Sequence, residues 1–348
     1  MVSPANTLHN VDLPAPFLPT KPTRSPWLIR TVTLLTRSLA AARSSRLWVA
    51  ITALGYLCAV SESDHKKFGS LAILAAGICF GTTGTSQTLL GKGISPLAVA
   101  STRLFIGALT LVLISRITTK VPRVKIGKSD LWIAGLGIAI YQLSFFSSVK
   151  LTGVPIATIT ALGSAPVFTG IVAYVMVQER PKRVWFIATV ITTIGIILLN
   201  AHHSEKSFNA LGVLLALVAG LGFAFFNVTS RRALNSGVEP ARLAATVFSL
   251  AALAVFPFCF VAGTHWMFTI KGISLILWLG IFTTGLGYSL YAYGLKRVHS
   301  STASTLVLAE PATATLLAVV VLGDTLNVTS WVGIATVIVG LLFLATRG

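Results

Sequence analysis

The stretch Ile187–Leu199, IATVITTIGIILL, decides the fold class of this chain. It contains no charged residue, and with its neighbours it reaches the roughly 20 apolar residues that a membrane-spanning helix needs. A spanning β-barrel would show short segments of alternating hydrophobicity instead. Nine more such runs lead us to predict an all-α integral membrane protein with ten transmembrane helices. The predicted spans are 69–90, 95–115, 130–149, 153–177, 183–201, 210–230, 241–263, 273–295, 299–322 and 327–346.

The composition excludes an ordinary soluble protein. Hydrophobic residues make up 54% of the 348 residues and charged residues only 10%, whereas a soluble domain carries about 25% charged residues. The mean hydropathy is +0.84. A net charge of +18 would by itself suggest a nucleic-acid binder. So few charges cannot cover a soluble surface, so we expect the lipid bilayer and no nucleic acid as a partner.

The basic residues orient the predicted helices. Of the 27 Lys and Arg, 22 fall on the side of the N-terminus, four fall on the other side, and Arg103 lies within a span. Cytoplasmic loops carry an excess of Lys and Arg. We therefore expect a multi-pass protein of the cell membrane with both termini in the cytoplasm.

The second half of the chain repeats the first at an offset of 144 to 146 residues. Each half then holds five spans, an odd number, so the second half must insert upside down relative to the first. Such inverted repeats are the architecture of many secondary transporters. The matching pairs are Pro96 and Pro240, Trp132 and Trp278, Lys150 and Lys296, Pro166 and Pro311, Glu179 and Asp324, and Gly195 and Gly340.

Two motifs connect these repeats to a known family. The stretch Gly77–Gln87 (GICFGTTGTSQ), followed by Pro96, Arg103 and Gly107, resembles the opening of an EamA-type repeat, and Leu308–Asp324 resembles its close. From about Gly69 to Leu344 the chain is similar to the EamA family of the drug/metabolite transporter superfamily. The resemblance implies ten spans in two five-helix repeats, cytoplasmic termini, and movement of small metabolites, often outward.

We divide the chain into a basic tail (1–67), a first repeat (68–201) and a second repeat (202–348). The tail departs from the family pattern, and we expect it to be largely disordered. Its 14-residue apolar run Leu47–Val60 is short for a span. The tail is a mistaken translation start, a basic tail with an interfacial helix, a transit peptide, or an eleventh span. We favour the first two.

No cofactor or metal site is predicted. The three cysteines, Cys58, Cys79 and Cys259, are far apart and form no C-x-x-C motif. Gly91-Lys92-Gly93 lacks the spacing of a phosphate-binding loop. Transport powered directly by ATP within this chain is therefore not expected.

Glu310 and Arg103 are the charged candidates inside the spans. An ionisable group near the bilayer midplane is costly and is usually functional or paired. For Glu310 we weigh substrate-amine contact or protonation, with proton coupling, against a structural role at the kink made by Pro311. For Arg103 we weigh binding of a substrate carboxylate or phosphate against a structural partner such as Glu310. For Arg103 we favour the structural role.

Polar side chains cluster in six spans and suggest a cavity, whereas spans five and ten are almost purely aliphatic and are expected at the periphery. Single Ser and Thr residues often bond to their own helix, but amides need several partners. The further substrate-cavity candidates are Gln87, Tyr141, Gln142, Asn227, Tyr288 and Tyr291.

Helix contacts account for most other distinctive residues. Gly77 and Gly81 form a G-x-x-x-G motif that permits close helix packing. Glu179 and Asp324 end spans four and nine, and helix capping or a loop contact is their favoured role. Because inversion puts these two acids on opposite membrane faces, gating is the alternative.

The sequence therefore predicts a secondary transporter of a small metabolite that works by alternating access. Export of amino acids or related compounds is the leading specific hypothesis, and it rests on the resemblance alone. A membrane-embedded lipid-modifying enzyme and a non-transporting scaffold are the alternatives. An enzyme is disfavoured because no spaced His, Asp or Glu set appears in the loops. A homodimer is left open.

Overall fold

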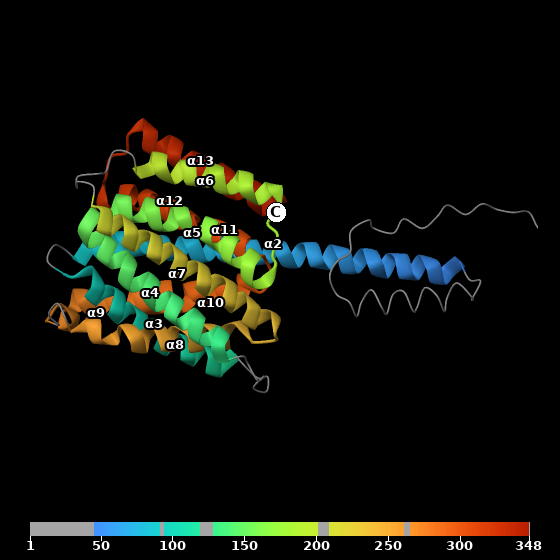
Figure 1. The fold of residues 1–348 in the computed structure, drawn as a ribbon, viewed down its shortest axis with the longest axis horizontal. Coiled ribbons are helices and arrows are strands. Elements are labelled where there is room, and N and C mark those ends of the chain that lie inside the picture. The colour runs from blue at the N-terminus through green and yellow to red at the C-terminus, as the bar shows by residue number, and fades with distance from the viewer. Residues whose placement is uncertain (1–44, 91–93, 119–127, 201–208, 261–264, 348) are drawn as a thin grey trace, which may run out of the picture. The chain divides into compact units, whose positions relative to one another are not determined.

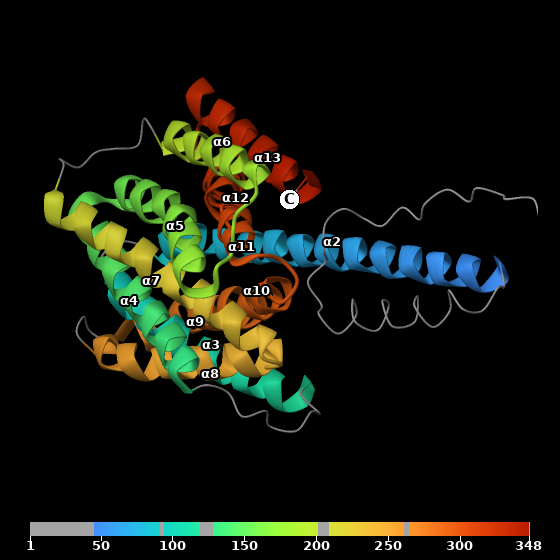
Figure 2. The same ribbon diagram turned by 45° about the vertical axis from the view of Figure 1, so that its right-hand side comes forward.

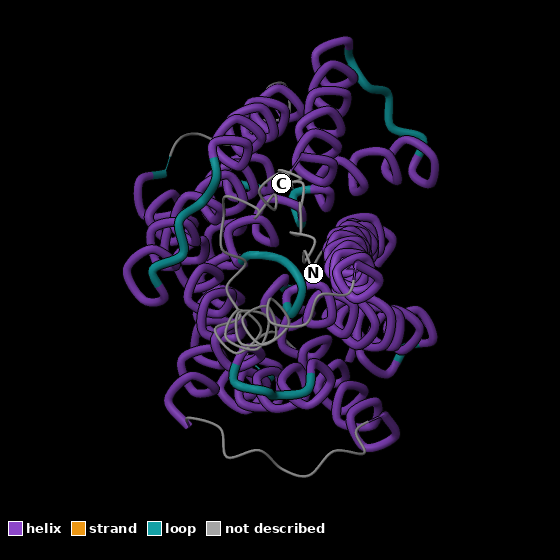
Figure 3. Tube along the Cα trace, turned by 90° about the vertical axis from the view of Figure 1, so that its right-hand side faces the viewer, coloured by secondary structure: helices purple, strands orange, loops and turns teal. Residues whose placement is uncertain are grey.

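The computed structural model describes residues 45–90, 94–118, 128–200, 209–260 and 265–347, with side chains from His65 onward. The chain divides into two compact units, 1–60 and 61–348. The second unit holds the spans. Viewed along the helices, its described residues form helices and connections without a strand (Figure 3).

Ten described helical segments are long and apolar enough to cross a membrane, so the predicted all-α membrane fold is confirmed. The first five spans lie in α2 (Ser45–Leu90), α3 (Pro96–Thr118), α4 (Lys128–Thr152), α5 (Val154–Val177) and α6 (Arg183–Asn200). The second five are formed by α7 (Ala210–Asn235); α8 (Pro240–Val255) with η1 (Phe256–Cys259); α9 (Ile270–Leu277), η3 (Trp278–Leu286) and α10 (Gly287–Leu295); α11 (Ser300–Leu306), α12 (Ala309–Leu317) and η4 (Ala318–Leu322); and α13 (Val328–Arg347). A short helix, η2 (His265–Phe268), precedes α9.

Helix α2 begins at Ser45, before the predicted start of the first span. Residues 45–67 are therefore helical, whereas the sequence predicted a largely disordered tail in which only the run Leu47–Val60 was a candidate interfacial helix. No proline interrupts residues 45–90, so the helix that starts in the apolar run continues into the span. Residues 1–44 lie outside the described residues, and the hypotheses about them stay predictions.

Helices α6 and α13 lie side by side at one edge of the bundle (Figure 1). Each packs mainly against the other, while α3 and α8 lie at the opposite edge (Figure 2). Spans five and ten were expected at the periphery, and this arrangement agrees with that expectation. Their outward side chains, such as Ile187 and Val339, are exposed in the protein and suit contact with lipid.

The contact between α6 and α13 is reciprocal. A Cβ on Gly195 would lie 2.7 Å from the backbone nitrogen of Val337, and one on Gly340 would lie 3.1 Å from that of Thr192. Thr192 and Val337 are themselves equivalent at the repeat offset of 145. Equivalent residues therefore exchange places across this contact, as a two-fold relation between the repeats requires.

A second pair of equivalent sites has the same backbone geometry. Helix α5 is followed by Gln178, with φ of 54°, and the Glu179 N–H donates to the Ala173 carbonyl at 3.1 Å. In the other repeat, η4 is followed by Gly323, with φ of 74°, and the Asp324 N–H donates to the Ala318 carbonyl at 3.3 Å. Both are helix C-terminal caps with a left-handed residue.

Aromatic rings fill the centre of the bundle between α2, α4, α7, α8 and α10. Tyr288 lies 4.1 Å from Phe248 between ring centroids, and Phe226 stacks on Tyr291 at 6.1 Å. This cluster lies behind one wall of the cavity described next.

Candidate functional site

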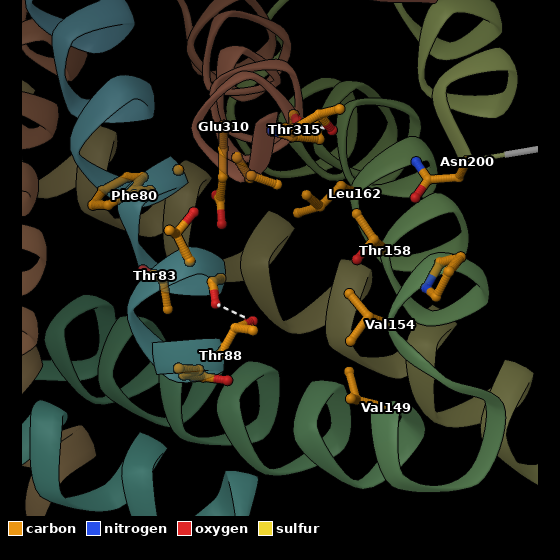
Figure 4. A pocket seen from close by; sticks show the side chains of 18 of the residues that line it. Phe80, Thr83, Thr88, Val149, Val154, Thr158, Leu162, Asn200, Glu310 and Thr315 are labelled. Carbon is orange, nitrogen blue, oxygen red and sulfur yellow. Dashed lines mark hydrogen bonds between the residues drawn. The ribbon is translucent and has the colours of Figure 1, made fainter. Parts of the chain in front are cut away.

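A cavity of about 820 Å³ extends from Glu310 to the chain connections at one face of the bundle. Thr88, Val154 and Asp324 line that end of the cavity and are exposed, so the cavity is open there. We call this the cavity face. Figure 4 shows Glu310 pointing from α12 into the space between α2 on one side and α5 and α6 on the other.

The Glu310 side chain enters the cavity because its span is broken. Helix α11 ends at Leu306, and α12 starts at Ala309. Pro311 has no N–H to donate to the Val307 carbonyl, and this carbonyl accepts the Glu310 N–H at 2.9 Å instead. The predicted continuous span 299–322 is therefore interrupted directly before Glu310.

Two glycines bring α2 against this break. A Cβ on Gly77 would lie 3.0 Å from the Ala309 side chain, and one on Gly81 would lie 2.9 Å from the Glu310 carbonyl oxygen. The G-x-x-x-G motif thus packs as the sequence predicted. It places Thr83, Thr85 and Gln87 of α2 along the same cavity as Glu310.

Arg103 lies behind this wall and has partners other than Glu310. Its guanidinium donates to the Thr83 hydroxyl at 3.3 Å and to the side-chain amide oxygen of Gln142 at 3.2 Å. It also lies over the Phe146 ring, 5.8 Å from the centroid. Thr83 and Phe146 line the cavity, whereas Arg103 does not. Arg103 therefore fixes the cavity wall and adds positive charge near it.

Several polar atoms at this wall have no hydrogen-bond partner in the described part of the chain. They are the Thr85 hydroxyl, the side-chain amide nitrogens of Gln87 and Gln142, and Arg103 Nε. Thr85 and Gln87 line the cavity directly. An unpaired buried polar group costs about 1–3 kcal/mol, so a ligand or water that bonds to these atoms would be stabilised.

The four remaining sequence candidates lie in the aromatic centre. The Tyr291 hydroxyl donates to the side-chain amide oxygen of Asn227 at 2.6 Å, and both residues are buried. Tyr141 and Tyr288 are also buried, with exposures of 8%. None of the four lines the described cavity. Their part in transport stays a prediction.

The opposite face is closed by Glu179, and we call it the Glu179 face. Its carboxylate accepts hydrogen bonds from the hydroxyls of Ser300 and Ser301, both at 2.7 Å, and from their backbone N–H groups at 3.3 and 3.2 Å. This caps the start of α11. Arg231 and His299 lie 3.9 and 3.7 Å from the same carboxylate.

The surroundings of Glu179 keep it ionised. Burial alone would raise its pKa, but hydrogen bonds from His299, Ser300 and Ser301 outweigh burial and lower the pKa to about 2. The predicted capping role is thus visible, with α11 as the capped helix. Sequence analysis missed Ser300 and Ser301, although a Ser pair at a predicted helix start is a capping pattern.

The described residues contain no group of three or more His, Cys, Asp or Glu able to hold a metal ion. Cys79 and Cys259 are free and buried.

The EamA-like transporter family model matches residues 67–201 and 210–346. The chain belongs to the EamA-like transporter family. Within this family each match contains one five-helix repeat, and the two matches together cover the ten spans. The protein is therefore a multi-pass membrane transporter of a small molecule.

Individual relatives agree with the family assignment. The uncharacterized transporter YwfM of Bacillus subtilis (strain 168) is 36% identical over 276 residues, covering 79% of this chain and 93% of that protein. The threonine/homoserine exporter RhtA of Salmonella typhimurium is 30% identical over 253 residues, covering 70% and 80%. A solved crystal structure matches with a TM-score of 0.67 at 20% identity, covering 80% of this chain and 98% of that one, which supports the fold alone.

Proposed function

We propose that this EamA-family protein exports amino acids or related small metabolites by alternating access. The observation that carries the proposal is the cavity, which reaches Glu310 from one face while the Glu179 cap closes the other. A site that opens to one face at a time is what alternating access requires. The 30% identity to an exporter of threonine and homoserine supports the substrate class.

The cavity suits a small amphipathic substrate with a cationic amine. Its volume lies within the 300–1,000 Å³ typical of small-molecule sites. Glu310 supplies one carboxylate for the amine, and the unpartnered groups of Thr85 and Gln87 supply neutral hydrogen bonds. Phe80 and Phe145 add apolar surface. Arg103 acts as a positioning residue because its terminal nitrogens already bond to Thr83 and Gln142.

Proton coupling follows from the same carboxylate. The Glu310 side chain has no direct hydrogen-bond or ion-pair partner in the described part of the chain, although the charge of Arg103 acts on it from behind the wall. An amine or a proton in the cavity therefore competes for direct contact with the carboxylate. Export of an amine substrate in exchange for a proton is the resulting cycle. We further place the protein in the plasma membrane with both termini in the cytoplasm, which makes the cavity face external.

Uptake and counterflow of a panel of amino acids in proteoliposomes tests this function. The panel includes threonine and homoserine, and a pH gradient is imposed or removed. Glu310→Gln keeps the shape of the side chain but removes the charge, and we expect the flux to fall to about one-tenth or less. Glu239→Gln is the matched control, because Glu239 lies outside the cavity and its side chain caps no helix.

Absence of substrate-dependent flux across the panel would contradict export of amino acids and favour the lipid-modifying enzyme or the scaffold. Flux by Glu310→Gln with unchanged pH dependence would remove Glu310 from the mechanism. Crosslinking of the protein in membranes tests the homodimer independently of flux.

A further inference from the structure

The two repeats carry the same helix cap at opposite faces, but only one of the two acids has helix partners. Glu179 and Asp324 are equivalent, and each follows a left-handed residue and donates its N–H to the carbonyl six residues earlier. Glu179 then caps α11 through four hydrogen bonds. Within the described part of the chain, the Asp324 carboxylate makes no hydrogen bond or ion pair, and it is exposed.

The helix equivalent to α11 lacks the cap that α11 has. Helix α5 starts after Gly153, and within the described residues no side chain forms a hydrogen bond with the N–H groups at its start. The two helices start with the same backbone hydrogen bond. The Ala157 N–H donates to the Gly153 carbonyl in α5, and the Ala303 N–H donates to the His299 carbonyl in α11. Asp324, Val154 and Pro155 line the same cavity. The free acid and the uncapped helix therefore border one opening.

We propose that Asp324 and the N-terminus of α5 form the gate of the cavity face. The gate closes when Asp324 caps α5 as Glu179 caps α11 here, and the Glu179 contact opens in the same transition. The inference rests on alternating access in the proposed function. It follows from the inverted repeat, because exchanging the conformations of the two repeats converts a cavity open at one face into one open at the other.

The segment that carries Asp324 is held by fewer side-chain hydrogen bonds to other helices than the first half of its span. The first half of its span is held by bonds to other helices: Ser304 receives a hydrogen bond from Thr169 at 3.1 Å, and Thr305 pairs with Thr189 at 3.0 Å. After the break, the hydroxyls of Thr313 and Thr315 bond only to carbonyls of their own helix. The π-helix η4, a form often found at functional sites, then leads to Asp324.

The two gates differ in strength. Glu179 binds two backbone N–H groups and two hydroxyls. Counted from the helix starts, the second residue is Ser301 in α11 and Pro155 in α5, and Pro155 has no N–H and no hydroxyl. An acid there reaches only the N–H groups of Val154 and Ile156. The Glu179 gate is therefore the stronger one, which favours the state with an open cavity face.

Cysteine labelling in membranes measures the gates without a substrate. The three native cysteines are replaced, Thr158→Cys in the cavity is the probe, and a membrane-impermeant maleimide is added from the cavity face. Labelling of Val328→Cys, an exposed position at the start of α13, identifies that face. Intact cells present one face and inverted vesicles the other.

Glu179→Gln should slow labelling of the probe by about tenfold, since it weakens several charge-assisted hydrogen bonds of the open state. Asp324→Asn should leave labelling as fast or faster, and in the Glu179→Gln background it should restore fast labelling. This compensation is a result that mere damage to the fold would not give. Asp130→Asn, which removes an acid paired with Arg232 at 3.2 Å, is the matched control and should change nothing.

A cysteine pair provides the second test. Oxidation of Asp324→Cys with Val154→Cys should form a disulfide, block labelling of the cavity probe, and be reversed by a reductant. Failure to crosslink, or failure of Asp324→Asn to restore labelling in Glu179→Gln, would overturn the gate. Because labelling needs no substrate, opposite and compensating shifts without flux would contradict the proposed substrate class and leave the gate standing.

Discussion

Spans four and nine are equivalent in the two repeats, yet one is a continuous helix and the other is broken. Helix α5 runs unbroken from Val154 to Val177 with Pro166 inside it. Its counterpart is divided into α11, α12 and η4, with the break just before Pro311. The same proline is therefore compatible with both shapes. The difference shows that the proline permits a break, and that the neighbouring residues and packing decide whether it forms.

The residue before each proline is the largest local difference. It is Ala165 in α5, with 2% exposure, and Glu310 in the broken span, lining the cavity. A carboxylate needs room and polar surroundings, which the break supplies. Span nine also takes 11 residue steps from Ser300 to Pro311, against 12 from Val154 to Pro166. Tighter turns of the 3₁₀ type rise about 2.0 Å per residue instead of 1.5 Å, so one residue fewer covers the distance.

The largest effect is expected when a carboxylate is placed before the proline of α5. Ala165→Glu puts a carboxylate into α5 at a buried position without a partner, so we expect a loss of stability of about 3–5 kcal/mol. Thermal unfolding and yield in detergent measure it. Glu310→Ala, which removes the carboxylate from its own site, should stay folded. A stable Ala165→Glu variant would show that α5 opens as span nine does.

A smaller effect is expected at the contact between α6 and α13, where two equivalent glycines meet different atoms. A Cβ on Gly195 meets the Val337 backbone nitrogen at 2.7 Å, while one on Gly340 meets the Thr192 side chain first and the nearest backbone atom, the Thr192 nitrogen, only at 3.1 Å. Gly195→Ala should therefore cost more stability than Gly340→Ala, within about 1–3 kcal/mol for overpacking. Thermal unfolding of both variants decides. Equal losses of stability would mean that the two glycine positions are equally crowded, although different side chains face them.

The third prediction is the smallest effect and concerns pH. The pKa of Glu179 is lowered from 4.5 to about 2. Its contribution to folding is thus fully present above about pH 4.5 and is lost as the pH falls from there through 2. Stability should therefore be unchanged between pH 5 and 8 as far as Glu179 is concerned. A decrease in stability should begin below pH 4.5 and should be smaller in Glu179→Gln. A change near pH 6 would point to another group.

Much of the fold was predictable from the sequence. Ten spans follow from apolar length, and the paired residues Pro166 and Pro311, or Gly195 and Gly340, revealed the repeat. These patterns depend on composition and spacing along the chain, which lipid and helix packing constrain directly. Glu310 was identified for the same reason, since a charge deep inside a span is conspicuous.

The walls of the site were less predictable. Tyr291 and Asn227 were expected in the cavity, but they bond to each other in the aromatic centre. A polar residue in a span has no sequence mark that tells a cavity from a neighbouring helix. Asn200 and Thr88, which do line the cavity, lie at helix ends, where polar residues are ordinary. The break at Leu308 also depends on tertiary packing, because Pro166 has the same local pattern without a break.

The reciprocal glycine contact has a consequence for how the two repeats associate. Gly195 meets Val337, and Gly340 meets the equivalent Thr192, so each repeat carries both halves of one self-complementary surface. Such an isologous surface is what a two-fold homodimer uses. A five-helix unit with this surface can associate with a second copy inserted in the opposite orientation. Within one chain the two units are always paired, and each can carry different residues at equivalent positions, as Ala165 and Glu310 show.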